Sequence, residues 1–453
     1  MSFSSFALRP ELLRGVDALG FTIPTPIQRE AIPPALEGRD VLACAMTGSG
    51  KTAAFALPIL QRVLATPRRA TRALILSPTR ELAAQIDEHV RALARDTRVT
   101  SAAVFGGVGM EPQVRAFRRP VDILVATPGR LLDHFQHPYA RLEGLEVLVL
   151  DEADRMLDMG FLPDIRRVLR HLPATARQTL FFSATIPPPI VALAREMLRD
   201  PVAINIERPP APASGITHAV YPVAGELKSA LLLALLERRD LESVLVFTRT
   251  KHRANRLADF LARHRVPCER IHGNRSQTQR TAALAGFKAG TCRVLVATDI
   301  AARGIDIDEL SHVVNFDVST VPEDYIHRVG RTARAEATGD AITFVAPAEE
   351  AELAAIERAI GRRLPRTTLA GFDYRARPAE RLEVPLAERI AAIRARKADE
   401  RARARASAER RAGHATASVL APASTRTPGA GRRAGARPGF PWRPGRTRPT
   451  ASR

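Results

Sequence analysis

The sequence predicts an α/β protein with two folded domains, each built on a mainly parallel β-sheet flanked by helices. Short apolar runs rich in β-branched residues recur along the chain, with helical stretches between them. These runs are continuous rather than alternating, which is typical of strands covered on both faces. The series stops at a Pro-rich segment and then restarts, which indicates a second domain.

Each expected strand is one of these apolar runs. The first series lies at residues 41–45, 73–77, 102–105, 122–127, 147–152 and 179–185. The second series lies at residues 244–250, 270–273, 293–299, 312–317 and 341–345. After about residue 372 the runs stop and Arg, Ala, Gly and Pro dominate. We therefore predict domains at residues 1–206 and 216–372, a linker at 207–215 and a basic, disordered tail at 373–453.

The bulk composition limits the cellular setting. The chain has 453 residues and a hydrophobic fraction of 45%, which suits two or three folded domains. Its three cysteines lie far apart without metal-ligand spacing, which argues against a disulfide framework or a zinc site. The start lacks the pattern of a signal peptide, and no apolar run is long enough to span a membrane. We expect a cytoplasmic protein that does not contact a membrane.

The positive charge is concentrated at the end of the chain. The formal net charge is +20, and residues 391–453 alone hold 16 Lys or Arg and 3 acidic residues. A basic tail on a nearly balanced body favours a polyanionic partner, and nucleic acid fits better than a membrane. A solubilising tail without a specific partner is the alternative that charge leaves open.

The stretch "AMTGSGKT" follows the first expected strand and has the form of a phosphate-binding loop. Gly48 and Gly50 permit a tight curl whose N–H groups face phosphate oxygens, and the helix that follows presents its positive end. Lys51 can reach the β- and γ-phosphates, and the Thr52 hydroxyl can bind Mg²⁺. This pattern predicts a nucleoside triphosphate site.

The stretch "VLVLDEADRML" ends a buried strand in three carboxylates, Asp151, Glu152 and Asp154. Clustered negative charge is costly to bury, so a cation is expected among these side chains. Asp151 can hold the Mg²⁺ that bridges the phosphates, and Glu152 can deprotonate the attacking water. Most acidic tetrapeptides are solvated surface, but the preceding strand and the phosphate loop favour a catalytic role here.

With these motifs in place, the chain resembles the DEAD-box RNA helicases, a family of superfamily 2 with two RecA-like domains. The resemblance extends from Phe3 to about residue 372 and covers nearly every family motif in order. The segment at residues 356–374 is similar to the bacterial RhlE-type group. The resemblance implies ATP and Mg²⁺ as cofactors and RNA as the partner.

The family's nucleotide motifs carry over residue by residue. The motif "GFTIPTPIQ" implies that Gln28 reads the adenine edge with support from Phe3, and "HRVGRTAR" implies arginine fingers that reach the γ-phosphate from the second domain. The implied cofactor contacts are Phe3, Phe21, Gln28, Thr47, Gly48, Ser49, Gly50, Lys51, Thr52 and Asp306. The implied catalytic residues are Lys51, Asp151, Glu152, His327, Arg331 and Arg334, with Thr52 and Asp151 as the metal ligands.

Motifs in both domains imply an RNA-binding surface. Residue types such as Gly, Thr and Arg suit phosphates and the 2′-OH rather than base edges, which implies sequence-tolerant binding. The implied RNA contacts are Pro78, Thr79, Arg80, Gly106, Gly107, Thr127, Arg130, Thr248, Arg249, Gly273, Gln277, Arg280, Thr298, Asp299, Arg303 and Gly304. Asp154, Ser183 and Thr185 are the residues implied to couple the nucleotide state to strand separation.

Three positions depart from the usual patterns. Ala45 stands where the general phosphate loop has its first Gly, Met46 where many family members have Gln, and Ala333 where a Gly is common between the finger arginines. The last two are small apolar changes beside functional residues, so they affect the expected rates more than the expected chemistry.

The leading hypothesis is an ATP-dependent RNA helicase that hydrolyses ATP to ADP and phosphate. Closure of the domains on single-stranded RNA or a short duplex would then separate strands locally. A second hypothesis is an ATP-timed RNA clamp or ribonucleoprotein scaffold with little unwinding, and a third is a DNA translocase. Ribosomal precursors and the RNA-decay machinery both fit as physiological partners, and the sequence does not choose between them.

Overall fold

The computed structural model describes residues 2–46, 48–66, 70–173, 177–206, 215–238, 241–302, 310–332 and 339–376. Almost all of the predicted linker and tail lies outside these ranges, as do the predicted site residues Thr47, Arg303, Gly304, Asp306 and Arg334. Within the described ranges, none of the helices has the length and apolar character that a membrane span requires.

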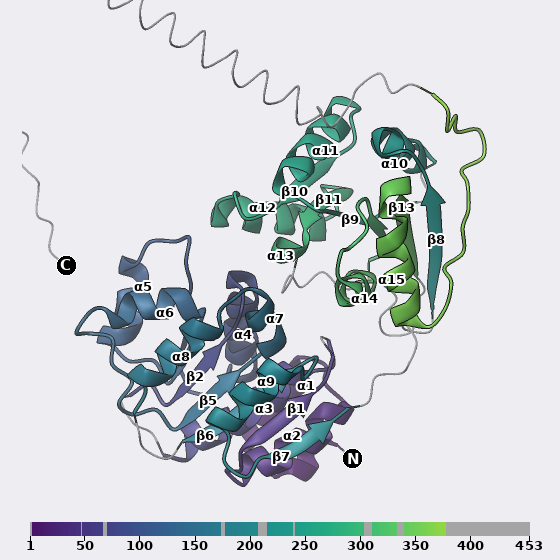
Figure 1. The fold of residues 1–453 in the computed structure, drawn as a ribbon. Coiled ribbons are helices and arrows are strands. Elements are labelled where there is room, and N and C mark those ends of the chain that lie inside the picture. Colours follow the sequence, from purple (N-terminus) through teal and green to yellow (C-terminus); the bar gives the residue numbers. More distant parts are fainter. Residues whose placement is uncertain are drawn as a thin grey trace, which may run out of the picture. The chain divides into compact units, whose positions relative to one another are not determined.

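The first domain is built on a seven-stranded sheet in the order β3-β4-β2-β5-β6-β1-β7, and every strand pair in it is parallel (Figure 1). Strands of a parallel sheet need crossover connections, and helices between consecutive strands supply them. The strands are β1 (Val41–Cys44), β2 (Ala73–Leu76), β3 (Ser101–Val104), β4 (Ile123–Ala126), β5 (Val147–Leu150), β6 (Gln178–Ser183) and β7 (Val202–Asn205).

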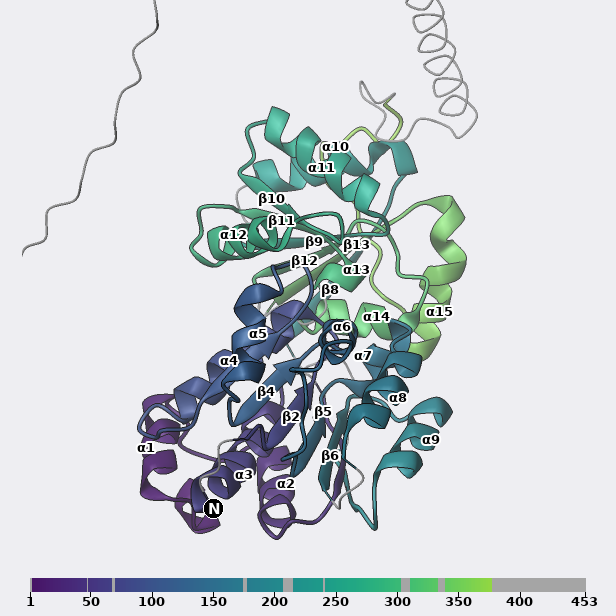
Figure 2. The ribbon, with the colours of Figure 1, turned by 90° about the vertical axis from the view of Figure 1, so that its left-hand side faces the viewer.

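Helices cover both faces of this sheet, so the first domain has a hydrophobic core on each side (Figures 1 and 2). Successive residues of a strand point to opposite faces, and Ile75 and Leu76 accordingly lie in different cores. One core packs against η1 (Phe3–Phe6), α1 (Pro10–Ala18), α2 (Pro26–Leu36), α3 (Lys51–Ala65) and α4 (Arg80–Leu93). The other packs against α5 (Glu111–Arg118), α6 (Pro128–Phe135), α7 (Ala153–Asp158), α8 (Leu162–His171) and α9 (Pro188–Met197).

The second domain repeats this plan with a six-stranded sheet in the order β10-β11-β9-β12-β13-β8, again with only parallel pairs. Its strands are β8 (Ile216–Pro222), β9 (Val244–Thr248), β10 (Cys268–Ile271), β11 (Val294–Thr298), β12 (His312–Asn315) and β13 (Gly339–Val345). Its helices are η2 (Gly225–Leu227), α10 (Lys228–Glu237), α11 (Lys251–Arg263), α12 (Gln277–Lys288), α13 (Asp299–Ala302), α14 (Pro322–Val329), η3 (Pro347–Glu349) and α15 (Glu350–Ile360).

The predicted fold class is confirmed, and every expected strand exists within a few residues of its expected bounds. The sequence analysis missed the edge strands β7 and β8. Both show partly exposed rather than continuous burial, so neither produces the uniform apolar run used to find the other strands. The residue boundaries of the two domains stay predictions.

The parallel topology places the predicted motifs together. All strands of a parallel sheet end at the same edge, and ligands of open α/β sheets bind beyond those carboxyl ends. The chain leaving β1 stays in register, because the Ala45 amide donates to the Ser183 carbonyl at 2.9 Å. The chain leaving β5 does the same, with the Asp151 amide 3.0 Å from the Leu76 carbonyl oxygen. The phosphate loop and the acidic motif therefore extend from one sheet edge.

Candidate nucleotide and RNA site

The phosphate loop connects β1 to α3 through a left-handed turn. Gly50 is the N-cap of α3 and has a φ of 93°, a value that glycine adopts without the steric penalty of a side chain. The Ser49 hydroxyl donates to the Met46 carbonyl at 2.7 Å, which tightens the curl. Lys51 is buried, and its Nζ donates to the Ala45 carbonyl at 2.9 Å. The loop thus holds its lysine beside the helix start, where phosphate oxygens would be received.

Gln28 is tied to the phosphate loop. Its Oε1 accepts from the Thr25 amide and its Nε2 donates to the Gly50 carbonyl, each at 3.0 Å. A Cβ placed on Gly50 would lie only 2.5 Å from Gln28 Nε2, so a larger residue there would displace this contact. An amide side chain has a second N–H and a second lone pair, which leaves capacity for the predicted adenine contact. That contact stays a prediction.

The two predicted aromatic residues belong to one stack. Phe3 and Phe21 lie 6.3 Å apart between ring centroids, and Phe21 lies 5.7 Å from the ring of His89. Phe3 is buried in the core, whereas Phe21 is only partly buried. Phe3 therefore packs against Phe21, and the roles of both rings at the nucleotide stay predictions. The sequence analysis did not identify His89, because a lone histidine on a helix carries no distinctive signal.

The acidic motif places two carboxylates in a buried environment. Asp151 is 2% exposed and Glu152 is 3% exposed. Burial raises the pKa of Asp151 to about 7, and the nearby Lys51 opposes that rise. Burial would also raise the pKa of Glu152, but Arg155, Lys51 and Arg331 outweigh it and lower that pKa. Glu152 is therefore held ionised, the state that a general base requires.

Glu152 also has an unusual backbone conformation. Its φ is 53° and its ψ is 51°, in the left-handed region that a residue with a Cβ rarely adopts. Such conformations cost on the order of 1–3 kcal/mol and cluster at functional sites. The Arg155 guanidinium lies 3.0 Å from a Glu152 carboxylate oxygen and fixes the side chain. The ion pair holds the carboxylate in one orientation, and the surrounding structure offsets the cost of the backbone conformation.

The donor set fits a magnesium ion and a triphosphate. Asp151 Oδ1 is buried and has no hydrogen-bond partner among the described residues, so it can accept a cation or a metal-bound water. Thr52 lies one residue beyond Lys51 in the first turn of α3. In the described part of the chain, no group of three or more acidic, His or Cys residues forms a metal cage. Mg²⁺ is commonly held by one or two protein oxygens together with substrate phosphates and waters, which matches this sparse set.

Asp154 connects the acidic motif to the end of β6. Its Oδ2 accepts from the Thr185 amide at 2.9 Å and from the Thr185 hydroxyl at 3.0 Å. Its own amide donates to the Ser183 hydroxyl at 3.1 Å. The structure therefore brings together the three residues predicted to couple nucleotide state to strand separation.

The first-domain residues predicted to bind RNA follow the carboxyl ends of β2, β3 and β4. The Arg80 guanidinium lies directly against the Gly107 backbone. A Cβ added to that glycine would be only 1.9 Å from an Arg80 guanidinium nitrogen, so a larger residue there would displace the guanidinium. The Arg130 guanidinium donates to the Val108 carbonyl at 3.0 Å and so holds the same glycine loop. Backbone amides, two arginines and helix starts share this edge, which suits phosphate contacts. The set also includes Pro78, Thr79, Gly106 and Thr127, with Thr79 and Thr127 as the N-caps of α4 and α6.

The second-domain set is less uniform. Thr248 is fully buried, and its hydroxyl donates to the Ala297 carbonyl at 3.3 Å. Asp299 accepts from the Arg328 guanidinium with both carboxylate oxygens, at 2.6 and 2.8 Å. Arg249 is partly exposed. The space beside Gly273 is open, because a Cβ added there would meet no atom within 4 Å. Asp299 thus orients Arg328, and its RNA contact, like that of the neighbouring Thr298, stays a prediction.

Two predicted RNA contacts of the second domain bind a carboxylate of the first domain, and their RNA contacts stay predictions. Gln277 Nε2 donates to Glu81 Oε1 at 2.9 Å, and the Arg280 guanidinium lies 3.0 Å from Glu81 Oε2. Glu81 is 7% exposed and follows the RNA motif "PTR" directly, but the sequence analysis did not select it. Its partners lie almost 200 residues away in the chain, so no local pattern connects them to Glu81.

The second domain also contributes to the electrostatics of Glu152. Arg331 is 6% exposed and is one of the charges that lower the pKa of Glu152. His327 lies in the last turn of α14, four residues earlier. Arg331 therefore acts electrostatically on the acidic motif, and its role as an arginine finger stays a prediction.

Comparisons with known proteins identify the class of molecule that this fold and site define. Residues 25–193 match the family model of the DEAD/DEAH box helicases, and residues 227–336 match the helicase conserved C-terminal domain. The chain resembles the Saccharomyces cerevisiae protein Dbp5 bound to RNA and ADP BeF3, with a TM-score of 0.73 and 33% identity over 81% of this chain and 95% of that chain. The two sheets therefore form RecA-like domains of a helicase.

Curated relatives identify the family within this class. The DEAD-box ATP-dependent RNA helicase CshA of Geobacillus kaustophilus is 40% identical over 383 residues, which cover 84% of this chain and 82% of the relative. The CshA protein of Bacillus subtilis is 41% identical over 81% of this chain and 74% of its own length. The chain belongs to the DEAD-box family of ATP-dependent RNA helicases. Because these relatives are named CshA, the finer RhlE-type assignment stays a prediction.

Proposed function

We propose that the chain hydrolyses ATP to ADP and phosphate and that closure of its two domains on RNA separates strands locally. The observation that carries this proposal is the meeting of Lys51, Asp151 and Glu152 at one sheet edge, with Arg331 of the second domain acting on Glu152. This arrangement supplies a phosphate contact, a metal ligand, a base and a cation for the transition state.

The nucleotide would lie along the loop between β1 and α3. Gln28 reads the adenine edge, and the loop amides with Lys51 bind the β- and γ-phosphates. Thr52 and Asp151 would hold Mg²⁺, which supplies charge neutralisation at the phosphates. The buried and unpaired Asp151 Oδ1 supports this assignment.

Hydrolysis requires that a water be deprotonated as it approaches the γ-phosphate. Glu152 is the general base in this proposal, since Arg155 keeps it ionised and oriented. Arg331 stabilises negative charge in the transition state, and Arg334 and His327 are proposed as its partners. Because Arg331 comes from the second domain, hydrolysis depends on the two domains being closed.

RNA would bind through its backbone. Arg80, Arg130 and the loop at Gly106 and Gly107 offer cationic and amide donors without a pattern that could distinguish bases. This supports sequence-tolerant binding of single strands and short duplexes. The Asp154–Thr185 contact joins the acidic motif to the end of β6 and supports a path by which ATP hydrolysis and RNA release are coupled. We further propose a cytoplasmic location and propose ribosomal precursors or the RNA-decay machinery as partners.

The alternative is an RNA clamp whose slow hydrolysis only times its release. The ionised Glu152 favours turnover, because a clamp would not need an activated base. A strand-displacement assay on a short RNA duplex separates these functions. We expect ATP-dependent strand release with RNA-stimulated phosphate release, whereas stimulated hydrolysis without strand release would favour the clamp. Equal stimulation by DNA and by RNA would favour a DNA translocase.

A further inference from the structure

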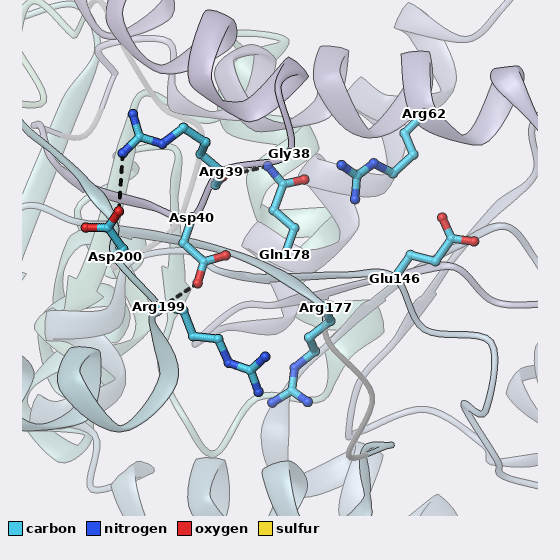
Figure 3. Close-up of a pocket in the computed structure, with 9 residues that line it drawn as sticks. All are labelled: Gly38, Arg39, Asp40, Arg62, Glu146, Arg177, Gln178, Arg199 and Asp200. Atoms are coloured by element: carbon cyan, nitrogen blue, oxygen red, sulfur yellow. Dashed lines mark hydrogen bonds and ion pairs between the residues drawn. The ribbon is translucent and has the colours of Figure 1, made fainter.

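The first domain contains a charged pocket of about 500 Å³ that the proposed reaction does not use (Figure 3). We call it the basic pocket; its charged lining is Arg39, Arg62, Arg177 and Arg199 with the carboxylates Asp40, Glu146 and Asp200, and Arg39 is paired with Asp200 at 3.9 Å. The lining comes from the ends of α2, α3 and α9 and from the starts of β1, β5 and β6. A volume of this size suits a small ligand.

The basic pocket lies at the opposite sheet edge from the phosphate loop. Asp40 directly precedes β1 and Glu146 directly precedes β5, whereas the phosphate loop and Asp151 follow those same strands. Both strands have four residues, which corresponds to a span of roughly 13 Å. A ligand in the basic pocket would therefore be distinct from the hydrolysed nucleotide and from RNA on the carboxyl edge.

The carboxylates of the basic pocket are already used in the fold. Asp40 accepts from the Thr179 amide and the Arg199 amide, both at 2.7 Å, with one oxygen each. Both Glu146 oxygens accept from Arg72, at 2.9 and 2.8 Å. These carboxylates hold backbone amides and a buried arginine in place, so each of their oxygens already accepts one hydrogen bond from a group other than the lining guanidinium groups.

The lining arginines are correspondingly short of acceptors. Among the described residues, Arg177 Nε is buried without a hydrogen-bond partner, and the Arg62 and Arg199 guanidinium groups make no hydrogen bond or ion pair. Burial lowers the pKa of Arg62 and the charge of Glu146 opposes that, whereas Arg199 is exposed. Figure 3 shows the Arg177 and Arg199 guanidinium groups close to each other. Burial lowers the pKa of Arg177, the positive charge of Arg199 lowers it further, and the carboxylate of Asp40 opposes both. Two cations that disfavour each other at one cavity are stabilised when an anion lies between them.

The favourable interaction of cations with helix C-termini explains only part of the clustering of arginines at the basic pocket. Cations are favourable near helix C-termini, and Arg62 lies in the last turn of α3. The Arg177 guanidinium likewise donates to the Pro173 carbonyl at 3.1 Å, just beyond α8. These contacts explain why single arginines occur at this edge. They do not explain why several point into one cavity with their remaining donors unused.

We propose that the basic pocket binds a small, multiply charged phosphate compound. Guanidinium groups pair with phosphate oxygens through parallel N–H donors, and charge-assisted bonds of this kind are among the strongest in proteins. Arg62, Arg177 and Arg199 approach the cavity from three different elements, so they can surround a diphosphate group. The site is independent of the proposed hydrolysis because it shares none of its residues.

The test measures binding of inorganic pyrophosphate to the full-length chain by calorimetry at physiological salt. The pocket variant is Arg62→Gln with Arg199→Gln, which removes two guanidinium groups and keeps the Arg199 amide bond to Asp40. Arg195→Gln is the matched control, an exposed arginine of α9 that does not line the pocket. Lys51→Ala disables the phosphate loop and so separates the two sites. Circular dichroism confirms that each variant is folded.

In a Lys51→Ala background, which removes binding at the phosphate loop, we expect pyrophosphate affinity to fall at least about tenfold on addition of the two pocket substitutions and to stay within twofold on addition of Arg195→Gln. Affinity that depends on Lys51 and not on Arg62 and Arg199 would overturn the proposal, as would absence of binding to the wild type. RNAs with 5′-triphosphate and 5′-hydroxyl ends provide a second arm. Binding of the 5′-triphosphate RNA end without binding of free pyrophosphate would also overturn the small-ligand assignment.

Discussion

Thr185→Val tests the contact that joins the acidic motif to β6. The substitution keeps the shape of the side chain and removes one hydroxyl, which donates to Asp154 Oδ2 at 3.0 Å. The Thr185 amide, 2.9 Å from the same oxygen, remains. Asp154 is 7% exposed, and although burial opposes ionisation, Lys51 and the hydrogen bonds of this cluster lower its pKa. The lost bond is therefore one to a buried and charged acceptor.

The expected magnitude follows from the chemistry of that bond. Hydrogen bonds to charged groups contribute about 1.5–3 kcal/mol, against about 1 kcal/mol for neutral pairs. The remaining amide still satisfies Asp154, so the lower value applies to Thr185→Val. A loss of about 1.5 kcal/mol in the local opening free energy corresponds to roughly tenfold faster amide exchange. Asp154→Ala removes both bonds and should cost about twice as much.

Hydrogen–deuterium exchange with mass spectrometry measures this locally, in a peptide that covers the end of β6 and Thr185. We expect about tenfold faster exchange in Thr185→Val and unchanged exchange in the Thr22→Val control, whose side chain is exposed. RNA unwinding should fall more than ATP hydrolysis in the same protein. Unchanged exchange in both Thr185→Val and Asp154→Ala would refute the stabilising role of this contact.

The remaining predictions concern the nucleotide site and acid stability. Glu152→Gln should lower the hydrolysis rate by about 10²–10⁴ while ATP still binds, and normal turnover in a phosphate-release assay would exclude Glu152 as the base. Gln28→Ala should weaken the selection of ATP over GTP, and it should also loosen the loop at Gly50 because the bond to the Gly50 carbonyl is lost. Competition binding of ATP and GTP measures this selectivity. An unchanged selectivity would contradict the adenine contact. Burial lowers the pKa of His218 to about 4, below the ordinary value of about 6.5. The folded state therefore binds this proton less well than the unfolded state does. As a result, the free energy of unfolding should decrease as the pH falls from about 6.5 to about 4. His218→Gln, which removes that titration beside Tyr325, should flatten the decline of the melting temperature with falling pH, and an identical pH profile would count against it.

The sequence could predict the central strands and the catalytic edge because both leave local signals. A strand covered on both faces requires a continuous apolar run, as at residues 147–150, and a phosphate loop requires glycine where φ is positive, as at Gly50. Parallel strands then bring the loops after their carboxyl ends to one edge. The positions of Lys51 and Asp151 follow from those rules alone.

The rest depends on pairings between distant residues that leave no local pattern. Glu81 meets Gln277 and Arg280 across almost 200 residues, and Arg328 pairs with Asp299 across 29 residues. The basic pocket was missed for the same reason, since its arginines are scattered along the first domain. In such cases an arginine's role depends on which carboxylate the fold brings to it.

The most direct test of the account is phosphate release by the full-length chain with Mg²⁺, measured with and without single-stranded RNA, in the wild type and in Arg331→Ala. We predict that RNA accelerates hydrolysis in the wild type and that loss of Arg331 lowers the stimulated rate by about 10³ or more, with ATP binding retained. A wild type that releases no phosphate under these conditions, or an Arg331→Ala protein that equals it, would contradict the account.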